Sequence, residues 1–277
     1  MNRSTEHAKF LPRWVTQFLT TNRFLTVIVC LGILVTLASG AAFAASQARA
    51  QAACELPAGN SAKIATAKLI IEYNATNDDM GVHGAFDDHG WSKLCVFDPN
   101  GKLVLQVKPR SQLQDLTIAG IFFESREPPI AEFPFAALKA RFPEGKYQVR
   151  ALKYDGTGLK GAATFTHNVP AKPNVISPTE GAVVPRKGLD IVWEPVTRTI
   201  EGKPVTISGY EVIITKVNHD DPNGFSRPVF DVHVPPDRNR LSVSVEFLEP
   251  ATDYELEVLA LEESGNQTIH VGSFRTK

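Results

Sequence analysis

Apolar and polar positions alternate in short runs along most of the chain after residue 53, which is the pattern of half-buried β-strands. The runs are rich in Val, Ile, Phe and Thr, and clusters such as DPNGK and DGTG, typical of turns, separate them. A first series consists of LIIEYNAT, SKLCVFD, KLVLQVK, LTIAGIFFES, YQVRALKYD and AATFTHNV. A second consists of GLDIVWEPV, ISGYEVIITKV, PVFDVHVP, NRLSVSV, DYELEVLALE and TIHVGSFRT. The pattern predicts an all-β chain.

One segment departs from this period. PFAALKARF, residues 134–142, has a proline at its start and apolar residues at helical spacing, which predicts one short helix. The segment NVPAKPNVISP holds three prolines in eleven residues and predicts a stiff linker. We therefore expect two tandem antiparallel β-sandwiches, in the order 51–62 N-terminal segment, 63–168 immunoglobulin-like sandwich with the helix, 169–178 linker and 173–277 second sandwich.

A proline followed four residues later by a tyrosine occurs once in each half, as Pro143 with Tyr147 and Pro250 with Tyr254. In a Greek-key sandwich the chain crosses from one sheet to the other, and a tyrosine hydroxyl at this corner bonds to backbone a few residues upstream. The bond satisfies a backbone group that has no strand partner. The spacing predicts such a corner in each sandwich.

The alternation after each tyrosine predicts which side chains face the core. The inward positions are Val149 and Ala151 in the first half and Leu256, Val258 and Ala260 in the second. Glu255, Glu257 and Leu259 are expected on the opposite face.

Residues 173–277 resemble a fibronectin type III domain. The resemblance rests on the proline-rich start PNVISP, on Trp193 in IVWEPV, on Tyr210 in GYEVIITKV, and on the Leu-x-Pro-x-Thr-x-Tyr run at Leu248, Pro250, Thr252 and Tyr254. The insertion HDDPNG, residues 219–224, departs from the pattern. The resemblance implies a spacer or a protein-binding platform, with Trp193 in the core. The first half resembles the front of uncharacterised exported bacterial proteins that end in such a module, which implies no chemistry.

The first fifty residues have the order of a secretory signal peptide. The basic residues Arg3, Lys9, Arg13 and Arg23 precede an apolar run at 24–40, and two Ala-x-Ala sites end at Ala44 and Ala50. Cleavage near either alanine predicts a periplasmic or secreted protein without a membrane span. The alternative is an uncleaved helical anchor, because the run nearly reaches the roughly 20 residues that span a bilayer.

Charge excludes some classes of partner. The chain carries a net −1, and since the leader through Ala44 carries +3, the remainder is near −4 without a Lys/Arg block. Nucleic acid and anionic lipid are therefore not expected as partners. Cys54 and Cys95 remain when Cys30 leaves with the leader, and in an oxidising compartment this pair is expected to form a disulfide. Two separate thiols are the alternative.

The segment NATNDDMGVHGAFDDHGW, residues 74–91, is the strongest candidate for ligand chemistry. Its aspartate oxygens suit Ca²⁺, and its histidines with acids suit a transition metal. The residues in question are Asp78, Asp79, Asp87, Asp88, His83 and His89. The composition favours a simpler interpretation, a pair of polar hairpin turns. His219, Asp220 and Asp221 are likewise expected in a solvated turn.

Exposed aromatic residues could provide a platform for sugar, with Trp91, Phe122 and Phe123 the first candidates. Catalytic signatures such as Gly-x-Ser-x-Gly and His-Glu-x-x-His do not occur in the sequence. Glu124 with Glu127 or Glu132 is the remaining acid/base hypothesis. The sequence thus predicts a non-catalytic exported protein without a required cofactor, which binds other proteins or cell-envelope components in adhesion or scaffolding. The alternative is a binder of Ca²⁺ or carbohydrate through the first sandwich.

Overall fold

The computed structural model describes residues 52, 54–57, 59, 61–217 and 229–277, and these are mostly β-strand with two short helices. The predicted export leader, with both predicted cleavage sites, and the HDDPNG insertion lie outside the described residues. None of the helices in the described part is long and apolar enough to cross a bilayer. Residues 50–277 form one compact unit.

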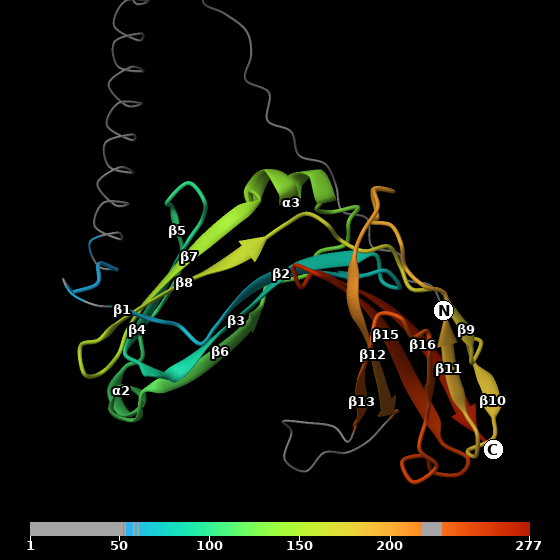
Figure 1. Ribbon diagram of the computed structural model, residues 1–277. Helices are drawn as coiled ribbons and strands as arrows, with labels where there is room; N and C mark the ends of the chain where they lie inside the picture. The colour runs from blue at the N-terminus through green and yellow to red at the C-terminus, as the bar shows by residue number, and fades with distance from the viewer. Residues whose placement is uncertain (1–51, 53, 58, 60, 218–228) are drawn as a thin grey trace, which may run out of the picture. The chain divides into compact units, whose positions relative to one another are not determined.

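The first half contains two facing sheets. One has the order β1-β8-β7-β4-β5 and the other contains β2, β3 and β6 (Figure 1). The strands are β1 (Ser61–Lys63), β2 (Thr66–Asn74), β3 (Asp79–Trp91), β4 (Lys93–Phe97), β5 (Leu103–Val107), β6 (Ile118–Glu124), β7 (Gly145–Leu152) and β8 (Gly158–Phe165). The predicted helix is α3 (Phe135–Arg141), which begins directly after Pro134. A second helix, α2 (Ser111–Leu116), was not predicted, because SQLQDL is short and buries none of its residues.

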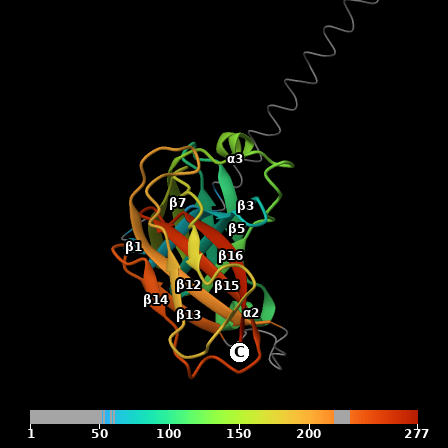
Figure 2. The same ribbon diagram turned by 90° about the vertical axis from the view of Figure 1, so that its right-hand side faces the viewer.

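The second half has a small sheet of order β14-β11-β9 opposite a larger one in which β13, β12, β15 and β16 follow each other. Figure 2 shows β12, β15 and β16 side by side. The strands are β9 (Val175–Ser177), β10 (Ala182–Val184), β11 (Asp190–Trp193), β12 (Ile207–Lys216), β13 (Val229–Val234), β14 (Arg240–Ser242), β15 (Asp253–Glu262) and β16 (Gln267–Thr276).

The two halves share one sheet. Residues Gln267–Ile269 of β16 pair in parallel with Glu72–Asn74 of β2, so that one sheet runs β13-β12-β15-β16-β2-β3-β6 through both halves. The segment expected to be a linker belongs in part to the folded core and to a sheet. Val169 is buried, and Val175–Ser177 pairs with β11. Proline removes only its own donor, and the residues around these prolines still form backbone bonds.

Two hydrophobic clusters fill the space between the sheets, one in each half. The first contains Trp91, and the second contains Trp193, whose indole packs 5.2 Å from the ring of Tyr210. The positions predicted to face inward are buried: Val149, Ala151, Leu256, Val258 and Ala260 are each at most 1% exposed. Leu259 lies on the opposite face, as predicted, yet it is only 3% exposed.

Both corner tyrosines reach backbone. The hydroxyl of Tyr147 donates to the carbonyl of Pro143 at 3.1 Å, and the backbone N–H of Glu249 donates to the hydroxyl of Tyr254 at 2.7 Å. Tyr210 accepts a bond from the N–H of Val196 at 2.8 Å. Each phenol therefore satisfies a backbone group where the chain leaves a sheet.

A disulfide joins Cys54 to Cys95, and both residues are buried with Phe97 in a small cluster of their own. The bond fastens the segment that precedes β1 to strand β4. Disulfides form and persist mainly outside the cytoplasm.

Candidate functional site

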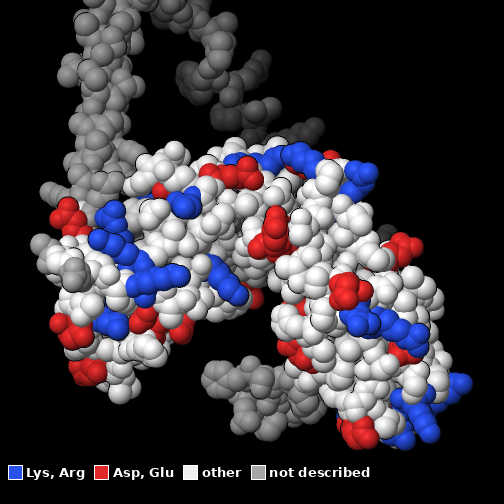
Figure 3. Space-filling model, in the orientation of Figure 1, with Lys and Arg blue, Asp and Glu red and all other residues white. Residues whose placement is uncertain are grey.

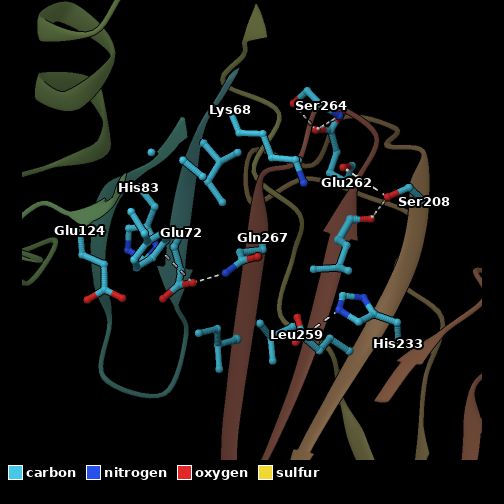
Figure 4. A pocket seen from close by; sticks show the side chains of 18 of the residues that line it. Lys68, Glu72, His83, Glu124, Ser208, His233, Leu259, Glu262, Ser264 and Gln267 are labelled. Atoms are coloured by element: carbon cyan, nitrogen blue, oxygen red, sulfur yellow. Dashed lines mark hydrogen bonds and ion pairs between the residues drawn. The ribbon is translucent and has the colours of Figure 1, made fainter. Parts of the chain in front are cut away.

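A hollow lies on the outer face of the shared sheet, where β2 and β16 meet. It is a groove of about 740 Å³ lined by residues of β2, β3 and β6 from the first half and of β12, β13, β15 and β16 from the second (Figure 3). Figure 4 shows side chains from both halves that line the same space, with Glu72 and Gln267 joined across the junction. The groove therefore depends on the pairing of the two halves.

The lining has a strong charge bias around an apolar floor. Six glutamates line the groove, at positions 72, 124, 211, 257, 262 and 263, against one lysine, Lys68. The floor carries Ile70, Ile213, Leu259, Leu261 and Ile269. This combination suits a ligand that is positively charged and partly apolar.

Burial destabilises the negative charge of several of these carboxylates. It raises the pKa of Glu211 to about 7, with the nearby carboxylate of Asp231 adding to the effect. Burial also raises the pKa of Glu257, where Glu255 and Glu72 add repulsion. A bound cation would stabilise the charged form of these carboxylates, so the electrostatics of the groove favour a cationic ligand.

Two trios of metal-ligating residue types lie at the groove, one in each half. The first consists of Glu72, His83 and Glu127, and the second of Glu211, Asp231 and His233. In the first trio His83 is 4% exposed, its Nε2 is 2.5 Å from Oε1 of Glu127, and its Nδ1 is 3.6 Å from Oε2 of Glu72. The imidazole thus lies between the two carboxylates, each approached by a different ring nitrogen.

Burial raises the pKa of Glu72, and the repulsion of Glu127 and Glu124 adds to this, whereas His83 and the amide of Gln267 lower it. Gln267 belongs to the second half, so Glu72 connects the histidine of the first half to the junction. Phe122 packs edge-on against the His83 ring at 5.9 Å.

The acids and histidines predicted as one metal site are not brought together. The 74–91 segment is a hairpin turn followed by the single long strand β3, and not the expected pair of polar turns. Asp79 and Asp88 stand about 30 Å apart along that strand at about 3.3 Å per residue. Side chains that are neighbours in sequence, such as Asp87 and Asp88, also point to opposite faces of a strand. These six residues therefore do not form one cation site.

Each member of that set has its own place. Asp78 accepts a bond from the Tyr73 hydroxyl at 2.9 Å, and Asp88 accepts from the N–H of Ala65 at 3.0 Å. Asp87 and His89 are exposed, and only His83 lines the groove.

The proposed aromatic platform is likewise divided. Trp91 is fully buried and its Nε1 donates to the carbonyl of Ala119 at 2.9 Å. Phe123 packs on the first core near Phe86. Phe122 is 63% exposed and is the one member of the three that lines the groove.

Of the carboxylates considered as an acid/base couple, Glu124 and Glu127 both lie close enough to Glu72 to repel it, whereas Glu132 has another partner. Glu124 lines the groove, Glu127 contacts His83, and Glu132 pairs with the exposed guanidinium of Arg126.

Sequence reasoning missed Glu211, Glu257 and His233. Glu257 had been assigned to the outer face of its strand, and the same alternation with apolar residues around Glu211 and His233 was a usable signal. The sequence gives no comparable signal for the junction that forms the groove. The junction consists of three residues of β2 paired with three of β16, and these segments are far apart in the sequence.

The substitution Glu257→Gln tests the electrostatic description of the groove. A raised pKa in the folded state means that this carboxyl favours folding below its ordinary value of about 4.5 and loses that contribution as pH rises through the raised value. We expect the variant to match the parent in melting temperature at pH 4 and to melt a few degrees higher at pH 8. Glu194→Gln, at an exposed position outside the groove, is the control and should show no such pH-dependent gain. Equal melting of parent and Glu257→Gln at pH 8 would contradict the description.

Comparisons with known proteins give structural similarity only. No protein-family model matches the sequence, and none of the curated proteins matches it. Among solved structures, a segment of two fibronectin type III domains from chicken tenascin is 12% identical to this chain, with a TM-score of 0.28. The match covers 76% of this chain and 99% of that segment. The FN1–FN3 domains of chicken CNTN1 are 13% identical with a TM-score of 0.28, covering 78% of this chain and 65% of that one.

Proposed function

We propose that this protein is an exported, non-catalytic binding module that holds a positively charged, partly apolar segment of another protein in the groove on its shared sheet. The observation that carries the proposal is the excess of six glutamates over one lysine around an apolar floor. Adhesion or scaffolding in the cell envelope is the role that this activity would serve.

The distribution of charge along the groove supports a peptide more than a single small ion. Glu72 and Glu124 stand on the side of the first half, and Glu211 and Glu257 on that of the second, with Leu259 and Ile269 between. An extended segment across the sheet could place basic side chains toward both rims and an apolar side chain on the floor. Its basic residues would gain partly desolvated carboxylate partners, which strengthens charge pairing compared with an open surface.

Export is part of the proposal. The leader predicts it, and the Cys54–Cys95 disulfide supports an oxidising compartment. We propose a periplasmic or secreted location, with attachment through an uncleaved N-terminal helix as the alternative.

The alternative function, a small-ligand binder in the first sandwich, has weaker support. A sugar platform would use several exposed aromatic rings, and of the predicted three only Phe122 is open to solvent at the groove. The predicted Ca²⁺ ligands lie far apart along β3.

Fluorescence anisotropy with two synthetic peptides tests the proposal. One peptide alternates Lys and Leu and the other alternates Glu and Leu, both measured with EDTA present and at low salt. We expect the Lys/Leu peptide alone to bind, and the triple variant Glu124→Gln, Glu257→Gln, Glu263→Gln to weaken it by about tenfold or more.

The matched control removes the same number of charges at exposed positions outside the groove, as Glu55→Gln, Glu194→Gln and Asp237→Asn. It should bind the Lys/Leu peptide within about twofold of the parent. Binding of both peptides alike, or equal weakening in the two triple variants, would refute the groove as the site.

A further inference from the structure

We infer that Glu211, Asp231 and His233 form a site for one divalent transition-metal ion on strands β12 and β13. These residues provide one imidazole nitrogen and two carboxylate groups, a donor set suited to Zn²⁺ and similar ions. The metal site shares Glu211 and His233 with the groove of the peptide-binding proposal, and the two are tested apart because the peptide measurements contain EDTA.

The strand register brings the three side chains together. Glu211 of β12 pairs directly with His233 of β13, and Asp231 lies two residues before His233 on the same face. One ligand atom from each of the three lies within 4.8 Å of the others. Side chains on neighbouring, regularly paired strands hold this arrangement without the help of a loop.

The distance between the imidazole and the carboxylate fits shared coordination better than a direct bond. Nε2 of His233 is 3.5 Å from Oε1 of Glu211, beyond the usual range of about 2.7–3.2 Å for a hydrogen bond. Two ligands at about 2.0–2.1 Å from a tetrahedral metal ion are separated by about 3.3–3.4 Å. A metal ion could therefore lie between these atoms with little movement of either side chain.

The charge at the site calls for a cation. Ligand oxygens of Glu211 and Asp231 lie within 4.8 Å of each other, and the ion pairs formed by the described residues bring no lysine or arginine to this trio. Glu211 has a side chain only 17% exposed, whereas that of His233 is 70% exposed. A metal ion would neutralise the two carboxylates, and the exposed side would leave a coordination position for water or for a donor from a partner.

The trio in the first half is a poorer site, although its residue types are similar. Nε2 of His83 is already 2.5 Å from Glu127, a direct bond, while Glu72 approaches the other ring nitrogen. One metal ion cannot lie on both sides of the same imidazole ring. The geometry thus favours the β12–β13 trio.

Titration calorimetry of the purified full-length chain with Zn²⁺, followed by the visible absorption of added Co²⁺, tests the site. We expect one ion per chain with a dissociation constant in the micromolar range or below. His233→Ala and Asp231→Asn should each weaken binding at least tenfold and abolish the Co²⁺ absorption of this site. Both residues are exposed, and circular dichroism would verify that the variants fold.

The matched control is His89→Ala, which removes an exposed histidine from β3 and should leave the affinity unchanged. His83→Gln serves as a second comparison, because binding at the other trio would respond to it. The inference is overturned if the parent does not bind Zn²⁺, if His233→Ala binds as tightly as the parent, or if the loss follows His83 in place of His233.

Discussion

Reduction of the Cys54–Cys95 disulfide is expected to lower the free energy of unfolding by about 4 kcal/mol. The two cysteines are 41 residues apart in sequence, and closing a loop of that length removes about this much conformational freedom from the unfolded chain. The bond also keeps the segment before β1 in place against Cys95 and Phe97, both of which are buried. Chemical denaturation with and without a reductant would measure the difference.

The double variant Cys54→Ala, Cys95→Ala is the control for the reductant itself. It should be about as unstable as the reduced parent, and a reductant should not change it further. Equal stability of the oxidised and reduced parent would show that the bond does not stabilise the fold.

The substitution Asn266→Ala is expected to cost about 3 kcal/mol, because it removes a polar link between the two halves. The Asn266 side-chain oxygen accepts the N–H of Ile71 at 2.8 Å, and its amide nitrogen donates to the carbonyl of Thr166 at 3.1 Å. Asn266 is 1% exposed and Ile71 fully buried. Alanine leaves a buried donor and an acceptor unpaired, at about 1–3 kcal/mol for each group.

Denaturation would measure the loss, and hydrogen exchange would locate it. The Ile71 amide should exchange faster in Asn266→Ala, as should amides of the three-residue β2–β16 pairing. Asn100→Ala, at an exposed position in the turn between β4 and β5, is the control and should change stability by less than about 0.5 kcal/mol. Unchanged exchange at Ile71 would mean that the asparagine does not hold the junction.

The alternation of apolar and polar residues predicted which face of a strand each side chain occupies, but not how exposed the outer face would be. The alternation in DYELEVLALE assigned Glu257 and Leu259 to one face and Leu256 and Val258 to the core, and burial agrees for the core positions. It could not indicate that Leu259, on the outer face, would be only 3% exposed, since periodicity reports only the orientation of a side chain.

The interpretation of residues 74–91 went wrong for a related reason. Asp, Asn and Gly are common in turns, and composition therefore outweighed the strand period in this segment. Pairing with β2 on one side and β6 on the other supplies hydrogen bonds that make a strand of Asp79–Trp91 in spite of its composition.

The sequence by itself determined the β-strand content, the inward positions after Tyr147 and Tyr254, the short helix and the cysteine pair. These follow from local periodicity, from the spacing of proline and tyrosine, and from the even number of cysteines beyond the leader. Only the tertiary structure decided that β2 and β16 join two sheets into one, and with that the acidic groove and the two histidine–carboxylate trios. The physical reason is that pairing between residues about 195 positions apart depends on the relative placement of the two halves, which no local pattern encodes.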